Sequence, residues 1–137
     1  MEKQFHCVML VDDDEISNFI SEKIIKNLNI TNNVKVVSNG KLALHFVKEN
    51  CDHSESQPLC PDFILLDINM PVMDGFQFLD EFSKLSVPGF EKIKIIILTS
   101  SNNPKDVASA EKYKIDGYIN KPLSKEKFEM AMKTLRN

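Results

Sequence analysis

Short runs of hydrophobic residues alternate with segments of helical periodicity along the chain. Runs of strand length, some of them rich in β-branched residues, predict buried strands. Between these runs, apolar residues recur every three or four positions, a spacing typical of amphipathic helices. The predicted strands cover residues 7–11, 34–37, 63–66, 93–98 and 118–119.

A predicted helix follows each of these strands. Asn103 is an N-cap residue with Pro104 at the first helical position, and Ser124 caps the last helix. The second helix begins after Asn39-Gly40. The apolar positions that define the helical faces are Ile16, Phe19, Ile20, Ile24 and Leu28 in the first helix, Ala43, Phe46 and Val47 in the second, Phe78, Leu79, Phe82 and Leu85 in the third, and Phe128, Ala131, Met132 and Leu135 in the fifth.

Five strands alternating with five helices predict an α/β domain with a doubly wound, five-stranded parallel sheet. The strands are almost continuously apolar, as in a sheet that helices cover on both faces. The length of 137 residues fits one domain, so we expect a single unit over 1–137 without an output domain. A crowded polar stretch at about 50–61 predicts a loop insertion.

The candidate functional residues stand directly after four of the predicted strands. Asp12-Asp13-Asp14-Glu15 follows the first strand, Asp67 the third, Thr99-Ser100-Ser101 the fourth, and Asn120-Lys121-Pro122 the fifth. Parallel strands bring their carboxyl ends to one edge of the sheet, where α/β proteins bind ligands. We therefore expect an acidic cluster, a hydroxyl and a lysine to converge at this edge.

Such a cluster suits phosphoryl chemistry assisted by a cation. Converging carboxylates repel one another unless a cation lies among them, and oxygen ligands with open water positions favour Mg2+. A carboxylate can also act as a nucleophile and form an acyl phosphate. A lysine ammonium and a hydroxyl can hold the phosphoryl oxygens. The pattern thus predicts a Mg2+-assisted phosphoryl site.

Each of these features alone has a simpler interpretation. The acidic run can cap a helix and interact with its dipole. Asp67 and the residues after it can form a turn, Lys121-Pro122 can be a surface loop, and Thr99 can be structural. Their joint occurrence, in order and at strand ends, is what favours the functional interpretation.

Composition and charge exclude some classes of function. The formal net charge is -3, with 42% hydrophobic and 27% charged residues, which is ordinary for a soluble protein and unlike a general nucleic-acid binder. The N-terminus lacks an apolar segment of signal-peptide length, and no apolar run is long enough to span a membrane. We expect a cytoplasmic protein that binds neither nucleic acid nor membrane directly.

The three cysteines match no zinc signature. Cys7 lies in the first apolar run and is expected to be a small core residue. Cys51 and Cys60 flank the polar stretch at about 50–61. A disulfide between them is one alternative, but two reduced thiols are the expectation for a cytosolic protein.

These motifs resemble those of receiver domains in two-component response regulators, from Val8 to Leu135. The most specific string, Asp67 to Gly75, resembles the phosphoacceptor loop of that family at every characteristic position. The strings Leu10 to Glu15, Leu98-Thr99-Ser100 and Lys121-Pro122 match the other signatures. The resemblance implies a single, chemotaxis-type receiver domain with a flavodoxin-like (βα)5 fold and strand order 2-1-3-4-5. The insertion at about 50–61 is longer than in minimal receivers, and it is either a tolerated surface loop or a partner site.

The resemblance also implies a role for each residue of the site. Asp67 would accept the phosphoryl group, and Lys121 would pair with it. Asp13 would bind Mg2+ directly, and Asp12 would act mainly through water. Asp67 and the backbone carbonyl of Asn69 would complete the protein ligands of the metal.

The same resemblance implies residues that switch conformation and residues that set the rate of dephosphorylation. Thr99 would move to hydrogen-bond a phosphoryl oxygen, and Tyr118 would turn inward when it does; a purely structural edge-strand aromatic is the alternative for Tyr118. Asn69 and Ser101 match positions that tune the rate of dephosphorylation. A cis peptide bond at Lys121-Pro122 is implied as well.

The implied function is a signalling switch that catalyses only its own phosphorylation and slow autodephosphorylation. A sensor histidine kinase or a histidine phosphotransfer protein would donate the group, and a downstream protein target would bind the surface of the fourth helix, fifth strand and fifth helix. An aspartyl phosphatase is an alternative, but it needs a proton-transferring carboxylate two residues after the nucleophile, where Asn69 stands. A nucleotide or flavin binder needs a glycine-rich loop, and the four glycines are not clustered.

Overall fold

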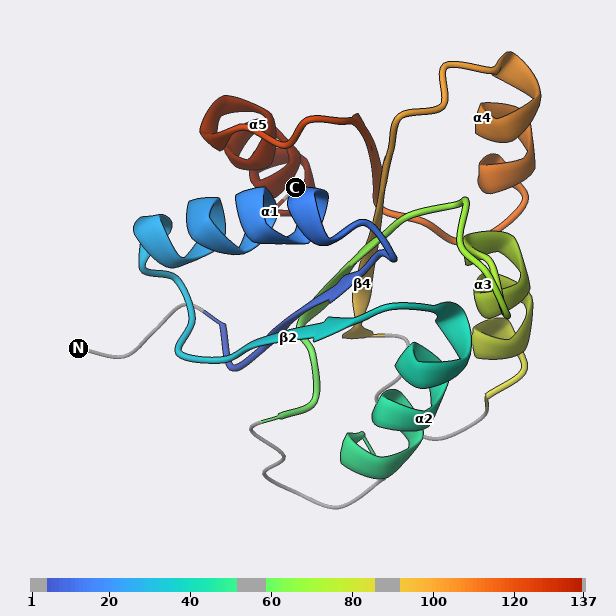
Figure 1. Ribbon diagram of the computed structural model, residues 1–137, viewed down its shortest axis with the longest axis horizontal. Helices are drawn as coiled ribbons and strands as arrows, with labels where there is room; N and C mark the ends of the chain where they lie inside the picture. Colours follow the sequence, from blue (N-terminus) through green and yellow to red (C-terminus); the bar gives the residue numbers. More distant parts are fainter. Residues whose placement is uncertain (1–4, 52–58, 86–91, 137) are drawn as a thin grey trace.

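The computed structural model describes residues 5–51, 59–85 and 92–136, so the central part of the predicted insertion, 52–58, lies outside the described residues. The elements in chain order are β1 (Val8–Val11), α1 (Glu15–Leu28), β2 (Val34–Val37), α2 (Gly40–Asn50), β3 (Phe63–Leu66), α3 (Gly75–Ser83), β4 (Lys94–Thr99), α4 (Pro104–Glu111), β5 (Gly117–Asn120) and α5 (Lys125–Arg136). Helices α1 and α5 cover one face of the sheet, and α2, α3 and α4 cover the other (Figure 1).

The five strands are parallel and lie in the order β2-β1-β3-β4-β5, which confirms the predicted fold class and strand order. Val11 at the end of β1 pairs with Leu66 at the end of β3. The residues that follow these two, Asp12 and Asp67, therefore leave the sheet at the same level. Their proximity is a consequence of strand register.

Two helix starts follow the predicted capping chemistry. The Asn103 side chain accepts a hydrogen bond of 2.9 Å from the N–H of Lys105, at the start of α4. At the start of α5, the Ser124 hydroxyl oxygen accepts a bond of 3.1 Å from the N–H of Lys127. Such caps satisfy backbone donors that a helix leaves unpaired and contribute roughly 1 kcal/mol each. The caps therefore fix where α4 and α5 begin after β4 and β5.

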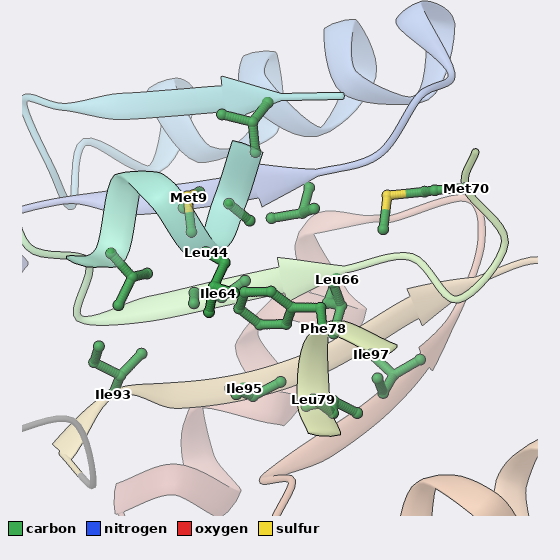
Figure 2. Close-up of a cluster of buried hydrophobic side chains, with 14 of the residues drawn as sticks. Met9, Leu44, Ile64, Leu66, Met70, Phe78, Leu79, Ile93, Ile95 and Ile97 are labelled. Atoms are coloured by element: carbon green, nitrogen blue, oxygen red, sulfur yellow. The ribbon is translucent and has the colours of Figure 1, made fainter. Parts of the chain in front are cut away.

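Two apolar clusters hold the helices onto the sheet. On the face covered by α2, α3 and α4, Phe78 shares a buried cluster with Leu66 and Ile97 (Figure 2). On the opposite face, the rings of Phe63 and Phe128 lie with their centroids 5.5 Å apart. Burial of each such side chain contributes roughly 1.5–3 kcal/mol. The two clusters therefore hold the strands and helices that carry the predicted site in place. The side chain of Leu135, which was predicted to lie on the apolar face of the fifth helix, is outside the described part of the chain.

Helix α1 differs from the prediction in the face that it buries. Ser21 and Ile25 are buried, but Ile16 and Phe19 are 74% and 65% exposed, and Ile20 is exposed too. The apolar residues of α1 lie around a wider part of the helix circumference than the part that packs against the sheet. Their periodicity alone does not tell which of them are buried. The N-terminal half of α1 therefore presents apolar side chains to solvent.

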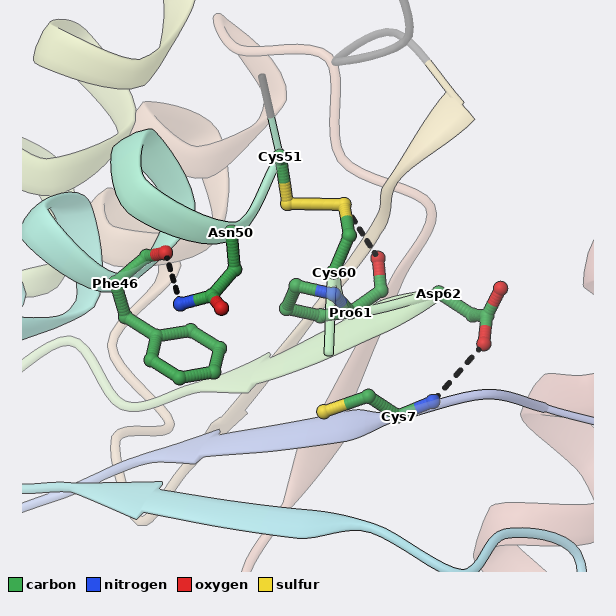
Figure 3. The surroundings of a disulfide bond; sticks show 7 residues. All are labelled: Cys7, Phe46, Asn50, Cys51, Cys60, Pro61 and Asp62. Atoms are coloured by element: carbon green, nitrogen blue, oxygen red, sulfur yellow. Dashed lines mark hydrogen bonds between the residues drawn. A yellow bond between two sulfur atoms is a disulfide. The ribbon is translucent and has the colours of Figure 1, made fainter. Parts of the chain in front are cut away.

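Cys51 and Cys60 form a disulfide, so the expectation of two reduced thiols is wrong (Figure 3). Cys51 ends α2, Cys60 precedes β3, and their Cα atoms lie 4.9 Å apart, within the range that the bond requires. The expectation of reduced thiols rested on the assumed cellular compartment. Whether the two cysteines can bond depends on the distance between them, which the fold sets. Cys7 is buried, as predicted, and it is a free cysteine; burial raises the pKa of its thiol to about 11.

Candidate functional site

Three carboxylates meet at the carboxyl end of the sheet. Asp12 follows β1 and Asp67 follows β3, and these residues are only 4% and 6% exposed. Asp13 is exposed beside them, and one carboxylate oxygen from each of the three lies within 4.8 Å of the others. Hard oxygen donors that remain partly open to water fit Mg2+ or Mn2+. The structure therefore brings together the acidic residues that the sequence predicts at this edge.

Lys121 reaches the same cluster from the loop after β5. Its Nζ lies 2.7 Å from a carboxylate oxygen of Asp12 and 3.3 Å from one of Asp67. The Lys121-Pro122 peptide bond is cis, as predicted. A largely buried ammonium group thus compensates part of the negative charge and stands where it can pair with a phosphoryl group on Asp67.

The electrostatics of the cluster follow from burial and from the neighbouring charges. Burial and the charge of Asp12 raise the pKa of Asp67, although Lys121 and the hydroxyl of Thr99 oppose this shift. For Lys121, burial acts to lower the pKa, but the hydrogen bond to Asp12 and the two carboxylate charges outweigh it, and the pKa is raised. The lysine therefore stays charged, and a nearby cation would favour the charged form of the Asp67 carboxyl.

Hydrogen bonds connect Thr99, which interacts with Asp67, to Tyr118. The Thr99 hydroxyl acts to lower the pKa of the Asp67 carboxyl, and its oxygen accepts a bond of 3.3 Å from the N–H of Ser101. The Ser101 carbonyl in turn accepts a bond of 3.3 Å from the Tyr118 hydroxyl. Thr99 is fully buried and Tyr118 is half-buried. The predicted switch hydroxyl and switch aromatic thus lie on one connected path.

The two predicted timing residues have different surroundings. Asn69 is exposed, two residues after Asp67 in the chain. The Ser101 hydroxyl donates to the carboxylate of Asp106, and its oxygen accepts a bond of 3.3 Å from the N–H of Asn103. The side chain of Ser101 is therefore engaged with the start of α4, while that of Asn69 is available at the rim of the site.

Asp14 stands apart from the carboxylate cluster, and Asn18 is a supporting residue that the sequence pattern did not single out. The Asp14 carboxylate caps α1 by accepting bonds of 3.0 and 3.3 Å from the N–H groups of Ile16 and Ser17. The Asn18 side-chain amide donates to the Asp12 carbonyl at 2.8 Å. Asn18 thus fixes the acidic loop against α1. The sequence pattern does not indicate this contact, because Asn18 lies six residues after Asp12 and belongs to no recognised motif.

Gly75 allows the loop after β3 to close against the site. Its N–H donates to the Ile68 carbonyl at 2.9 Å, and a Cβ at this position would lie 2.4 Å from the carbonyl oxygen of Asp67. A residue with a side chain cannot make this approach without moving the backbone. At Gly117, by contrast, the nearest atom to an added Cβ is 3.6 Å away, on Ile96.

We expect Gly75→Ala to destabilise the protein by roughly 1–3 kcal/mol and to displace Asp67, because the added methyl overlaps backbone atoms. Gly117→Ala is the matched control, since its methyl would make only ordinary contacts, and it should change stability by less than about 1 kcal/mol. Urea unfolding followed by circular dichroism measures both. Equal stability of the two variants would contradict the close approach at Gly75.

A groove of about 260 Å3 opens beside Lys121, between the start of α1 and the loop after β5. It adjoins the carboxylate cluster through Lys121, and the exposed apolar side chains of α1 form one of its walls. The lining residues are Asp14, Ile16, Ser17, Ile20, Lys121, Pro122 and Leu123.

The sequence matches one protein-family profile over nearly its whole length. That profile is the response regulator receiver domain, and the match covers residues 8–133. Among curated proteins, the response regulator Rcp1 of Synechocystis sp. is 27% identical over 125 residues, which are 90% of this chain and 82% of Rcp1. The nitrate/nitrite response regulator protein NarL of Escherichia coli (strain K12) is 30% identical, over 91% of this chain and 52% of NarL. The chain thus spans about half the length of NarL.

Solved structures of response regulators share the fold. One from Cytophaga hutchinsonii has a TM-score of 0.83 at 30% identity, and the match covers 99% of this chain and 100% of that one. The Mn(2+)-bound form of Rcp1 has a TM-score of 0.72 at 26% identity, over 93% and 89% of the two chains. The phosphorylated cyanobacterial phytochrome response regulator RcpA has a TM-score of 0.73 at 25% identity, with the same coverage of 93% and 89%.

Proposed function

Because this chain belongs to the response regulator receiver domain family, the phosphoryl-accepting switches of two-component signalling, we propose that Asp67 is its phosphoacceptor. The observation that carries the proposal is the buried Asp67 carboxylate at the end of β3, 3.3 Å from Lys121 and beside Asp12 and Asp13. The phosphorylated state of the similar structure RcpA gives further support.

The proposed reaction is the attack of an Asp67 carboxylate oxygen on the phosphorus of a phosphorylated histidine. The new oxygen–phosphorus bond forms as the donor's nitrogen–phosphorus bond breaks, and the product is an acyl phosphate. Lys121 pairs with one phosphoryl oxygen, and the Thr99 hydroxyl donates to another. The domain thus catalyses its own phosphorylation and slow autodephosphorylation, and Asn69 and Ser101 are the proposed timing residues for the second step.

We propose that Asp12, Asp13, Asp67 and the backbone carbonyl of Asn69 hold Mg2+. The all-oxygen donor set with an exposed member fits this cation, and the Mn(2+)-bound form of Rcp1 is a related structure with a divalent cation. When bound, the cation supplies positive charge to the phosphoryl oxygens. Asp12 is already paired with Lys121 and accepts from the N–H of Asp14, which agrees with a role mainly through water.

We expect Asp13→Ala to weaken Mg2+ binding about tenfold or more, because it removes a carboxylate ligand from a hard cation. Asp14→Ala should leave the affinity nearly unchanged, because the Asp14 carboxylate caps α1, and should instead cost about 1 kcal/mol of stability. Isothermal titration calorimetry with MgCl2 measures the affinity. A larger loss for Asp14→Ala than for Asp13→Ala would show that the ligand assignment in the acidic loop is shifted by one residue.

The direct test of the function uses a small phosphodonor such as acetyl phosphate. With Mg2+ present, intact-mass spectrometry should find a species heavier by one phosphoryl group, and addition of EDTA should suppress it. A protein that gains no phosphoryl group under these conditions, while it binds Mg2+, would refute the proposed function.

The proposed phosphodonor, a sensor histidine kinase or a histidine phosphotransfer protein, docks on the exposed side of α1. Any donor histidine must approach Asp67 at the carboxyl edge of the sheet. Ile16, Phe19 and Ile20 are exposed on the N-terminal half of α1, and Ile16 and Ile20 line the groove next to Lys121. An apolar patch next to a charged site fits an amphipathic helix of a partner.

We expect Phe19→Ala to slow phosphotransfer from a protein donor about tenfold, while phosphorylation by acetyl phosphate is unchanged. Removal of a large aromatic from the centre of an interface commonly costs more than about 1 kcal/mol. The donor is the histidine phosphotransfer domain that labels the wild type fastest in a panel. Met130→Ala on α5, where the side chain is also 72% exposed, is the matched control. Equal slowing by the two variants would place the docking surface elsewhere.

Output is proposed to pass through the surface of α4, β5 and α5 to a downstream protein target rather than to nucleic acid. The bonds from Thr99 through Ser101 to Tyr118 end on β5 and therefore connect Asp67 with this surface. None of the described helices is both long and apolar enough to cross a membrane. We propose that the protein acts in the cytoplasm, as the donors and targets of receiver domains do.

A further inference from the structure

The Cys51–Cys60 disulfide ties the end of α2 to the entry of β3 (Figure 3). Cys51 is 3% exposed within the apolar cluster shared by α2 and α3, whereas Cys60 is only partly buried. The entry of β3 is fixed to β1, because the Asp62 carboxylate accepts from the N–H groups of His6 and Cys7. The N–H of Asp62 also donates to the Cys7 carbonyl at 2.9 Å. The disulfide therefore attaches α2 to a fixed point of the sheet.

The other end of α2 contacts the loop that follows β3, residues 67–74. The N–H of Gly40 donates to the Met73 carbonyl at 2.9 Å. A Cβ on Gly40 would lie 2.9 Å from the Met73 side chain and 3.0 Å from Phe78, so the contact is close. Helix α2 thus spans the length of β3, linked covalently at the strand's entry and by hydrogen bonding to the loop at its exit.

We propose that Cys51 and Cys60 are a reversible redox site for small thiols and disulfides, and that the disulfide makes α2 hold the 67–74 loop more firmly. The two cysteines are adjacent in the fold, and one of them is accessible enough to react. In a cytosolic protein, such a bond is usually transient and redox-sensing. Any effect on the lifetime of the phosphoryl group rests on the proposed role of Asp67.

Reduction by a small thiol proceeds by two exchange steps. A thiolate attacks the Sγ of Cys60, the more exposed of the two residues, and Cys51 departs as a thiolate that takes up a proton. A second thiolate then attacks the small-molecule sulfur of the mixed disulfide, and Cys60 departs and takes up the second proton. Two electrons and two protons thus pass from two small thiols, which leave as their disulfide. Cys7 takes no part, because it is fully buried.

The test compares wild-type protein in oxidised and in reduced glutathione. Alkylation followed by peptide mass mapping should find Cys51 and Cys60 unmodified in the first buffer and both alkylated in the second. Amide hydrogen exchange at Gly40, Met73 and Gly75 should be about 3–10-fold faster in the reduced protein, because local opening becomes easier. The melting temperature should fall by roughly 5–15 °C, since a cross-link over a short loop is lost.

Matched variants separate the redox site from its proposed coupling. The Cys51→Ser, Cys60→Ser double variant should exchange like the reduced wild type in both buffers, and Cys7→Ser should respond as the wild type does. Cysteines that stay alkylatable in oxidised glutathione would overturn the redox site. A disulfide that forms but leaves exchange at Gly40 and Met73 unchanged would overturn the coupling. Neither readout involves phosphorylation, so failure of Asp67 as the phosphoacceptor would leave both results intact.

Discussion

Asp67→Asn is expected to abolish phosphorylation of the protein by acetyl phosphate in Mg2+, while the wild type gains one phosphoryl group. The neutral carboxamide is a poor nucleophile towards phosphorus. It also withdraws one negative oxygen from the carboxylate cluster that the cation would occupy. Intact-mass spectrometry after a fixed incubation measures the modified fraction directly, and it should fall to background in the variant.

Asp74→Asn is the matched control for this experiment. Asp74 belongs to the same string of the sequence, but its carboxylate accepts from the N–H of Gln77 in a capping box at the start of α3. Asparagine caps helices about as well as aspartate, so this variant should be phosphorylated as the wild type is. A phosphorylated peak of full strength in Asp67→Asn, or its loss in Asp74→Asn alone, would move the phosphoacceptor to another residue.

The Asp67→Asn variant is expected to fold, so a failure to become phosphorylated would reflect the missing nucleophile and not unfolding. An asparagine oxygen can still accept the 2.8 Å hydrogen bond that the Asp67 side chain receives from the N–H of Ile68. Burial and the charge of Asp12 raise the pKa of Asp67. A raised pKa means that the stability contributed by this group is lost as pH rises through its folded value. At neutral pH without a divalent cation, the variant should therefore melt no lower than the wild type.

The candidate site could be predicted because strand ends are visible in the sequence. Asp12, Asp67, Thr99 and Lys121 each stand directly after an apolar run or within two residues of one, and parallel register then brings them to one edge. The pairing of Val11 with Leu66 turns two distant aspartates into neighbours. No long-range contact had to be guessed once the alternation of strands and helices was recognised.

Contacts that depend on how each helix is rotated and placed against the sheet could not be predicted in this way. The apolar spacing of α1 is real, yet Ile16 and Phe19 point to solvent, because the sheet covers only part of the apolar arc. The distance between Cys51 and Cys60 depends on how α2 returns to β3, which neither spacing nor composition specifies. The support that Asn18 gives to the acidic loop likewise arises only after α1 is placed.

Thr99→Ala is expected to accept a phosphoryl group on Asp67 and yet to lose most of the resulting change on the α4–β5–α5 surface. Thr99 is fully buried at the end of β4, where its hydroxyl acts on the pKa of Asp67 and accepts a hydrogen bond from the N–H of Ser101. The Ser101 carbonyl continues this path to Tyr118. Without the hydroxyl, the first link is missing, although the nucleophile and Lys121 remain in place.

The size of the loss follows from a two-state equilibrium. A phosphoryl group favours the active state only through contacts that differ between the states, so the unmodified protein visits that state as a minority. One hydrogen bond to a charged group contributes roughly 1.5–3 kcal/mol. Its removal should shift the equilibrium roughly 10–150-fold towards the inactive state. Phosphorylated Thr99→Ala should then resemble the unmodified wild type at β5.

Solution NMR with and without beryllofluoride, a mimic of the phosphoryl group, measures this coupling at the amides of α4 and β5. Thr99→Ser is the matched control: like alanine it lacks the threonine methyl, but it keeps the hydroxyl. The serine variant should show shift changes close to those of the wild type, and the alanine variant should show small ones. If both variants respond as the wild type does, the hydroxyl carries no signal, and Tyr118 must be coupled to Asp67 by another route. If both lose the response, the methyl group packed at the end of β4 positions the switch, and the hydroxyl alone is insufficient.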